Sequence, residues 1–146
     1  MQNTDNYKYL NIADYEKIID LWQASGLSHR PLGRDSTENI TRQMLEDNTR
    51  FIGRYIENEL AAVAIVSHNG RKGWINRLAV APEFQHQKIA TQMITFCENW
   101  LHKQGIEIFA VLIEDDNAAS MQLFEKNGYI NHQDIIYYTK RVRDEI

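Results

Sequence analysis

The 146-residue chain is poor in the features that mark several large classes of protein. It contains a single cysteine, Cys97, which excludes a disulfide framework and a cluster of thiolates that would hold a metal. Its 16 basic and 20 acidic residues give a net charge of -4, and no basic run marks a track for nucleic acid. No apolar run approaches the roughly 18 residues of a membrane span, and residues 1–10 lack the pattern of a signal peptide. We therefore expect residues 1–146 to form one cytoplasmic domain that binds no metal, nucleic acid or membrane.

Strand and helix patterns alternate along the first third of the chain. Residues 7–13 predict a first strand, and Asp14 is placed to cap the helix that follows. This helix carries apolar side chains on one face, namely Tyr15, Ile18, Ile19 and Trp22. Two glycines and a proline predict a loop at residues 25–36. At its end, Asp35 or Ser36 is expected to cap a weaker second helix that runs to about Asn48.

An antiparallel meander is expected in the middle of the chain. Residues 50–80 contain three strand patterns, which two short turns separate. The turns fall at Glu57–Glu59 and at Asn69–Gly70. An Asn-Gly pair between strands favours a type I′ hairpin, because both central residues of that turn need a positive φ angle.

A strand–helix–strand unit follows the meander. The expected helix 88–104 stacks its apolar side chains at steps of three and four residues, namely Ile89, Met93, Phe96, Cys97 and Trp100. Gly105 stands where a left-handed residue ends a helix. Residues 106–113 are nearly all apolar, which predicts a strand that is covered on both faces and runs parallel to strand 73–80.

The last quarter of the chain predicts one more helix and one more strand. Asn117 is placed to cap a helix that ends before Gly128, and residues 134–142 are expected to close the sheet. The whole pattern predicts an α+β fold with a mixed, mostly antiparallel twisted sheet. It has a parallel β-α-β pair at its centre and helices on both faces.

Two motifs stand out within this order of elements. A strand that ends at Leu78–Val80 is followed by the helix start Gln-His-Gln-Lys-Ile-Ala at residues 85–90, and Asn117 begins a helix that ends in Phe-Glu-Lys-Asn-Gly-Tyr at residues 124–129. Both motifs resemble those of the GNAT superfamily, whose members transfer an acetyl group from acetyl-coenzyme A to an amine. The resemblance implies a GNAT-like fold and acetyl-coenzyme A as cosubstrate.

The resemblance also implies roles for particular residues. The helix start would hold the pyrophosphate on backbone N–H groups, and the pantetheine arm would pair with the strand edge between Leu78 and Val80. The Val80 N–H would face the oxygen of the tetrahedral intermediate, and Asn117 would bind the arm from the other side. The implied cosubstrate-binding residues are Leu78, Ala79, Val80, Gln85, His86, Gln87, Lys88, Ile89, Ala90, Asn117, Ser120 and Phe124.

The chain departs from the family motif at the helix start and in the final helix. Lys88 replaces a family glycine, and His86 occupies another frequent glycine site, so each brings a Cβ atom close to the expected phosphates. The Lys88 ammonium either offsets this by contacting the phosphates or obstructs them. Phe124 stands where many relatives have a tyrosine that protonates the leaving thiolate.

The sequence also leaves more than one possibility for the general base. Many relatives carry a glutamate on the strand before Val80, where this chain has Asn76 and Arg77. Glu114, at the end of the next strand, is the nearest carboxylate in the pattern. It is either the base or an acidic residue that favours the following helix start.

Two functions remain after this reading. The first is an N-acetyltransferase in which a primary amine of a small molecule or a protein attacks acetyl-coenzyme A directly. The second is a catalytically weakened GNAT-like domain that acts as an acyl-coenzyme A sensor or a protein-binding module. This alternative is motivated by Lys88, Phe124 and the missing strand carboxylate.

Cys97 shares a helix face with Met93 and is interpreted as a core thiol rather than a nucleophile. A homodimer is left open.

Overall fold

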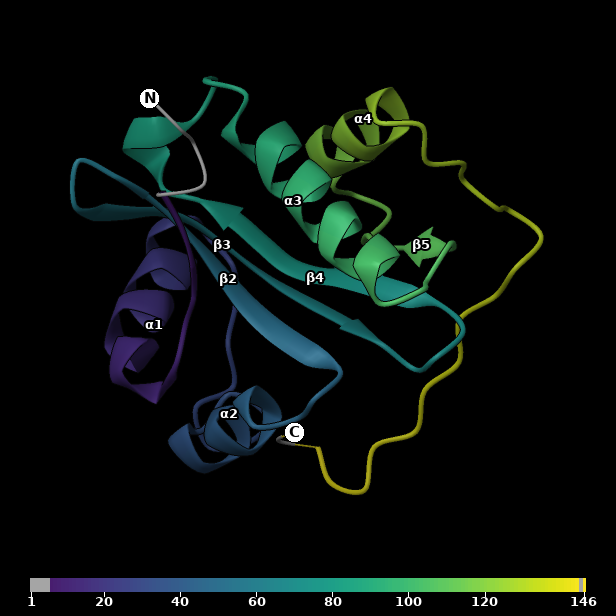
Figure 1. Cartoon of the computed structure of the whole chain (residues 1–146). Coiled ribbons are helices and arrows are strands. Elements are labelled where there is room, and N and C mark those ends of the chain that lie inside the picture. The colour runs from purple at the N-terminus through teal and green to yellow at the C-terminus, as the bar shows by residue number, and fades with distance from the viewer. Residues whose placement is uncertain (1–5, 145) are drawn as a thin grey trace.

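The computed structural model describes residues 6–144 and 146, and its described part contains five strands in one mixed sheet (Figure 1). The strands lie side by side in the order β1-β2-β3-β4-β5, with β4 and β5 parallel and the other pairs antiparallel. The strands are β1 (Tyr7–Tyr9), β2 (Thr49–Ile56), β3 (Glu59–His68), β4 (Gly73–Val80) and β5 (Phe109–Ala110). The helices are α1 (Tyr15–Ala24), α2 (Thr37–Met44), α3 (Ile89–Lys103) and α4 (Ala118–Lys126), with short 3-10 turns at Ile12–Asp14 and Pro82–Phe84.

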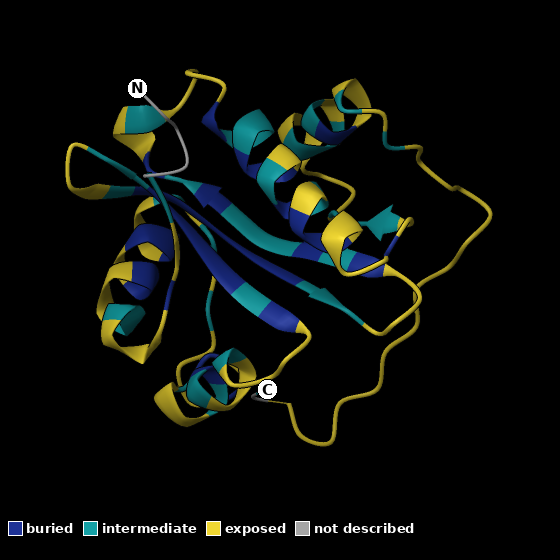
Figure 2. Cartoon of the chain, viewed as in Figure 1, coloured by how far each residue is buried: buried dark blue, intermediate teal, exposed yellow. Residues whose placement is uncertain are grey.

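The expected fold class is confirmed, with helices on both faces of the sheet. One hydrophobic cluster lies between the sheet and α3, with Met93, Cys97 and Leu101 fully buried. A second lies on the other face under α1 and α2, around Trp22 and Phe51 (Figure 2). Both helical stripes expected from the sequence therefore face the core. Among the described residues, no helix is long and apolar enough to cross a membrane.

The antiparallel meander is confirmed, but its type I′ turn lies in the other hairpin. Glu57 and Asn58, between β2 and β3, have φ angles of 50° and 69°. In the β3–β4 hairpin only Gly70 has a positive φ, because the Asn69 side chain accepts hydrogen bonds from the Arg71 and Lys72 N–H groups and holds a wider loop. The prediction of a type I′ turn at Asn69–Gly70 was therefore wrong.

The cap of α1 differs from the prediction, whereas the cap of α2 is one of the two residues that were expected. Asp14 precedes α1 but makes no cap hydrogen bond there. Instead, its carboxylate accepts from the Asn11 N–H in a capping box around the preceding 3-10 turn. Ser36 caps α2 by accepting from the Asn39 N–H, and the helix ends at Met44, earlier than expected. The first strand is shorter than predicted as well, because residues 11–14 form the capping box and turn.

The largest difference concerns the strands after α3. Only Phe109 and Ala110 of the predicted strand 106–113 pair with β4, opposite Gly73 and Trp74. Residues 134–142, predicted to close the sheet, form no strand and run outside the body of the protein towards α2 (Figure 1). The parallel pair thus lies at one edge of the described sheet rather than at its centre.

Candidate functional site

The end of β4 has unused main-chain groups on the side that faces β5. The Ala81 N–H donates to the Ala61 carbonyl at 2.8 Å, and Val80 lies opposite Ala62 in the next, non-hydrogen-bonded position of the ladder. The N–H and carbonyl of Val80 therefore point away from β3. Because β5 pairs with β4 only near Gly73 and Trp74, no strand of the described chain reaches Val80. The Gln85 amide donates to the Val80 carbonyl at 3.2 Å, which leaves the N–H open.

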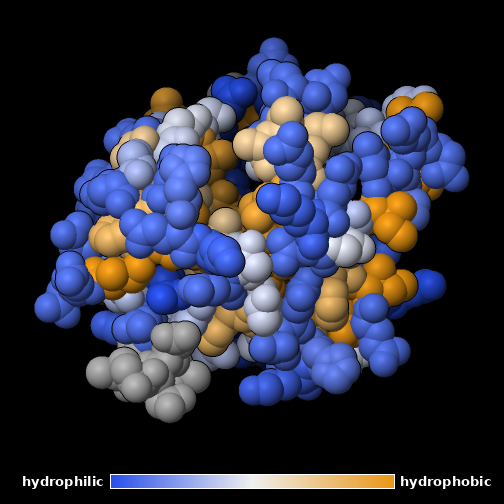
Figure 3. Space-filling view, turned by 90° about the horizontal axis from the view of Figure 1, so that it is seen from above, coloured by the Kyte–Doolittle hydropathy of each residue, from blue (hydrophilic) through white to orange (hydrophobic). Residues whose placement is uncertain are grey.

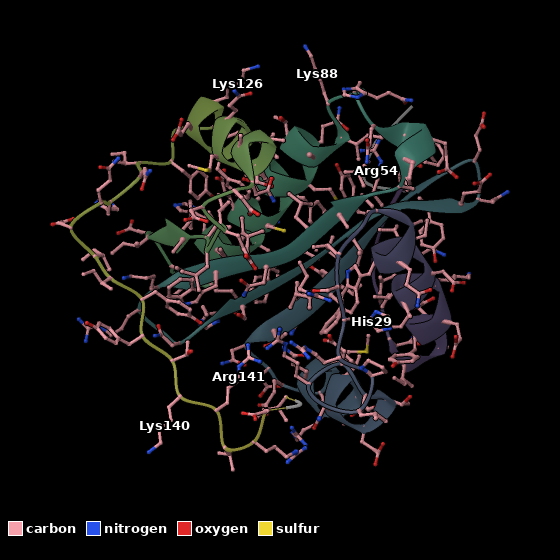
Figure 4. The ribbon with its side chains drawn as sticks, turned by 180° about the vertical axis from the view of Figure 1, so that it is seen from behind. His29, Arg54, Lys88, Lys126, Lys140 and Arg141 are labelled. Carbon is pink, nitrogen blue, oxygen red and sulfur yellow. The ribbon has the colours of Figure 1, made fainter. Side chains whose placement is uncertain are left out.

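The segment between β4 and α3 forms a turn that exposes the helix start. His86 and Lys88 have φ angles of 65° and 64°, a left-handed conformation that glycine adopts without strain. Lys88 is the residue before the first turn of α3, and no side chain caps this helix. Its first N–H groups are therefore available to a ligand. The Lys88 side chain points away from the ribbon into solvent (Figure 4).

The second motif forms α4, as expected from the sequence. The Asn117 side chain caps α4 by accepting from the Ser120 N–H at 3.1 Å. The helix ends at Lys126, and Gly128 has the left-handed φ of 91°. Phe124 is buried, 4% exposed, and its ring packs edge-on against Tyr129. These contacts explain the motif structurally, and they leave the amide nitrogen of Asn117 for other partners.

The groups that could move a proton differ in their surroundings. Glu114 is exposed in the loop between β5 and α4. The Tyr129 hydroxyl donates to the Glu98 carboxylate at 2.6 Å, and burial together with this carboxylate raises the pKa of Tyr129 well above its ordinary value. Burial, with a smaller effect of Glu98, raises the pKa of the Cys97 thiol to about 12. Cys97 is therefore a core thiol, as predicted, and Tyr129 is poorly suited to replace the missing tyrosine hydroxyl.

Sequence reasoning missed a buried charged cluster on the opposite face of the sheet. Arg77 lies in a β-bulge of β4 with a φ angle of 55°, and its guanidinium lies 4.2 Å from the centre of the Trp22 ring. It pairs with the buried Asp35 at 3.5 Å. Burial lowers the pKa of Arg77, Asp35 opposes this, and the nearby Arg34 adds to it. The only sequence signal was an arginine, beside Asn76, in a mostly apolar strand.

Asp35 also organises the loop that precedes α2. Its carboxylate accepts from the Arg30 N–H at 2.7 Å, and its carbonyl accepts from the Tyr15 hydroxyl. Arg77 therefore links β4 to this loop, and the pair is a structural tie between the sheet and residues 30–35. Asp35 does not cap α2, because this ion pair and these hydrogen bonds engage it instead.

The structure thus brings together most of the residues that the sequence singled out. The end of β4 and the start of α3 meet at the open side of the sheet, and α4 lies beside α3 (Figure 1). Leu78 and Val80 pack in the cluster on the α3 side, whereas Ala79 belongs to the opposite cluster. The side chain of Ala79 therefore points away from the proposed cosubstrate, and only its backbone is near. Ile89 is buried, so it too would act through its backbone.

The sequence that forms this open strand end and uncapped helix matches a known protein family. The model of the acetyltransferase (GNAT) family matches residues 15–129, which is more than half of the chain. The chain belongs to the GNAT family. The match runs from α1 to the end of the second motif, so it includes every residue of the candidate site.

Individual relatives agree with this family assignment. Acetyltransferase plu1384 of Photorhabdus laumondii is 28% identical over 88% of this chain and 90% of its own length. Among solved structures, the PaiA N-acetyltransferase of Thermoplasma acidophilum with coenzyme A has a TM-score of 0.72 at 20% identity, covering 83% of this chain and 86% of that one. An aminoglycoside 6′-N-acetyltransferase of Acinetobacter haemolyticus has a TM-score of 0.74 at 19% identity, covering 94% and 99%. At these identities the two structures show a shared GNAT fold.

Proposed function

We propose that this chain is an N-acetyltransferase that transfers the acetyl group of acetyl-coenzyme A to a primary amine of a small molecule or a protein. The observation that carries the proposal is the Val80 N–H, which points away from β3 beside the uncapped start of α3. The fold likeness to a GNAT protein crystallised with coenzyme A supports it. The likeness to an aminoglycoside N-acetyltransferase supports an amine as the acceptor.

The backbone around α3 suits the diphosphate of the cosubstrate. The free N–H groups and the positive end of the helix dipole both favour an anion at the first turn of α3. The open edge of β4 suits the pantetheine arm, because an amide chain can pair with a strand that has no neighbour. In this arrangement the side chains of Gln85, Gln87 and Lys88 surround the phosphates, and Asn117 binds the arm from the α4 side.

The chemical step needs a donor for the oxyanion and an acceptor for the amine proton. The Val80 N–H stabilises the oxygen of the tetrahedral intermediate as the amine attacks the thioester carbon. Glu114 is the proposed base, because an amine with a pKa near 10.4 must lose a proton before attack. The departing thiol has a pKa near 8.5, so it leaves as the thiolate without a tyrosine at the position of Phe124. The lack of that acid costs on the order of 10² in rate.

Binding is tested first, by following thermal unfolding with increasing acetyl-coenzyme A. Ligand at 100 times its Kd should add about 2.7 kcal/mol of stability. No shift at millimolar ligand would contradict both the enzyme and the sensor. Release of free thiol with a panel of amines then tests for turnover. The sensor is the second candidate, because a buried Phe124 and a β4 without a carboxylate weaken proton transfer. Binding without turnover on any amine would favour it.

The Val80→Pro variant tests the oxyanion donor directly. It removes the N–H that points away from β3, so it breaks no hydrogen bond of the β3–β4 ladder. We expect the variant to bind acetyl-coenzyme A but to lose about 10² to 10³ in kcat. Val80→Ala keeps the N–H and should retain most of the rate. Equal kcat in the two variants, with both folded, would show that Val80 is not the donor.

A further inference from the structure

Arg77 carries hydrogen-bond donors that nothing in the described part of the chain uses. Its side chain is only 21% exposed, and its Nε and Nη2 atoms are buried without a hydrogen-bond partner among the described residues. The third nitrogen, Nη1, is the one that reaches the surface. Buried polar groups are almost always hydrogen-bonded, and a guanidinium offers five N–H donors in a fork that fits a carboxylate. The unused donors of Arg77 therefore suit an anionic ligand.

The carboxylate beside Arg77 does not saturate it. Asp35 Oδ2 lies 3.5 Å from Arg77 Nη2 without a hydrogen bond, and the same oxygen accepts from the Arg30 N–H at 2.7 Å. Arg34 adds a second cation. Burial and, to a smaller extent, the Arg34 charge lower the pKa of Arg77, which Asp35 opposes. In what we call the Arg77 cluster (Arg34, Asp35 and Arg77), two cations thus share one carboxylate, and the cluster keeps a positive charge.

A basic cavity adjoins the Arg77 cluster at Arg34. Its volume of about 510 Å³ is in the range of sites for small molecules. The polar side chains that line it are Arg34, Asn39, Arg42, Gln43, Glu46 and Arg143. Three of them are arginines and only one is a carboxylate, so the potential in the cavity favours an anion. The space next to the cluster therefore has the same preference as the cluster itself.

The Arg77 cluster lies on the face of the sheet that the cosubstrate leaves free. The proposed cosubstrate site is on the side of α3 and α4, whereas Trp22 and Ala79 belong to the hydrophobic cluster under α1 and α2. The Arg77 guanidinium lies over Trp22, on this second face. The β-bulge turns the side chain there at a position only about 10 Å along the strand from Val80. An acceptor that approaches Val80 from the α1 and α2 side therefore passes Arg77.

We propose that the acceptor is a small amine that also carries a carboxylate, and that Arg77 and Arg34 bind this carboxylate while the amine attacks the thioester beside Val80. The inference rests on the proposed acetyl transfer and specifies its acceptor. The carboxylate accepts charge-assisted hydrogen bonds from Arg77 Nη1 and from the Arg34 guanidinium. It is unchanged by the reaction, in which the amine nitrogen bonds to the acetyl carbon, the thiolate leaves with the electron pair of the C–S bond, and the nitrogen loses one proton.

The same charges select against an acceptor that carries a second cation. A diamine would place an ammonium group near two guanidinium groups, which repel it. The net charge of -4 for the whole chain does not offset this, because charges beyond about 10 Å are screened at ordinary salt. Seen from above, the face with the end of β4 and the start of α3 is mostly hydrophilic, with hydrophobic side chains visible between the hydrophilic ones (Figure 3). Such a surface suits a small polar acceptor.

The experiment compares matched amines by the release of free thiol from acetyl-coenzyme A. A series of ω-amino carboxylates from β-alanine to ε-aminocaproate is paired with the corresponding primary amides, which keep the amine and the chain length but lack the negative charge. Putrescine tests a second cation. We expect at least one carboxylate to exceed its amide in kcat/KM by about 10- to 100-fold, the range of a hydrogen bond between charged groups, and putrescine to be the poorest acceptor.

Substitutions then test the two proposed donors. Arg34→Gln removes a charge, whereas Arg77→Lys keeps the charge beside Asp35 but loses the fork. Both variants should bring the preference for the carboxylate close to one by raising its KM, and both should leave the rates with the amides unchanged. Arg71→Gln is the matched control, because Arg71 is an exposed arginine in the β3–β4 loop, and it should keep the preference. Equal losses with carboxylate and amide would show that the cluster is only structural.

Fluorescence gives a test that does not need turnover. The Arg77 guanidinium lies 4.2 Å from the centre of the Trp22 ring, so an anion on it should change the emission of Trp22 in a saturable way. The matched amides should not, and Trp22→Phe should remove the response. Turnover of amides or putrescine as fast as of carboxylates would overturn the inference but keep the proposed acetyl transfer. No thiol release with any amine would contradict the transfer. Even then, the lack of a saturable response to every carboxylate would overturn the anion site, and its presence would support it.

Discussion

The Lys88→Gly variant separates the backbone strain at the start of α3 from the contribution of the Lys88 ammonium to phosphate binding. Lys88 has a φ of 64°, and a residue with a Cβ pays about 1 kcal/mol in the left-handed region. Glycine removes this strain but adds freedom to the unfolded chain, which costs a few tenths of a kcal/mol. We therefore expect Lys88→Gly to raise the free energy of unfolding by about 0.5 kcal/mol, as measured by urea denaturation without ligand.

The same substitution should weaken cosubstrate binding. The Lys88 side chain points into solvent, so its Cβ leaves the first N–H groups of α3 open while its ammonium can reach a phosphate (Figure 4). A charge-assisted contact at an exposed site contributes about 1 kcal/mol, so Kd for acetyl-coenzyme A should rise about fivefold. The dependence of Kd on salt should also flatten, because one cation is lost.

Lys126→Gly is the matched control for both measurements. Lys126 is an exposed lysine in the last turn of α4, where glycine costs about 1 kcal/mol of helix stability and no phosphate is expected. It should therefore lower stability and leave Kd unchanged. If Lys88→Gly lowers stability as Lys126→Gly does, the strain argument is wrong. If it tightens binding, the side chain obstructs the phosphates and the proposed contact is wrong.

Three further predictions test the packing and the charges. Gly73→Ala places a Cβ 2.6 Å from two methyl groups of the buried Leu101 and should cost about 1 to 3 kcal/mol in urea denaturation. In Gly70→Ser the added Cβ meets open space, so only the strain of its φ of 86° should remain, at about 1 kcal/mol. Arg77→Met should cost about 2 kcal/mol by leaving the Asp35 carboxylate without its cation, and Asp35→Ala in the same chain should recover part of it. The pKa of Cys97 is raised from near 8.5 in the unfolded chain to about 12 in the folded protein, so its contribution to stability is complete below pH 8.5 and is lost as the pH rises towards 12. Between these values the free energy of unfolding should fall by up to about 1.4 kcal/mol per pH unit. In Cys97→Ser it should fall less steeply over the same range.

The sequence predicted well those elements that local rules determine. The helical stripe of α3, the cap by Asn117, the left-handed Gly105 and the helix end before Gly128 each depend on neighbours within one or two turns. Local rules left a choice open where a distant group competes. Of the two residues expected to cap α2, Ser36 is the cap, whereas Asp35 is held by Arg77, which lies more than forty positions along the chain.

The strand end and the helix start that form the candidate site were predicted in position but not in geometry. The periodicity of apolar residues located the strand end and the helix start, because both depend on residues that are neighbours in the sequence. That Val80 points away from β3 follows from the register of β4, which the bulge at Arg77 shifts. A bulge depends on the pairing of two strands and leaves little local signal. The prediction that residues 134–142 close the sheet was wrong for a related reason. Their pattern indicates a strand, but it does not identify the strand with which they would pair.

Three of the five described non-glycine residues with a left-handed φ lie on the segment that leads into the candidate site. Arg77, His86 and Lys88 all have left-handed φ angles between the middle of β4 and the first turn of α3. At helix ends remote from this segment the chain uses Gly105 and Gly128 in the same conformation. Glycine would fold more easily at positions 86 and 88, so we expect His86→Gly/Lys88→Gly to be more stable than the wild type by about 1 kcal/mol and yet to bind acetyl-coenzyme A less tightly. Stability measured by urea and affinity measured by titration should thus change in opposite directions. A double variant that gains both would show that the two side chains serve no purpose at the phosphates.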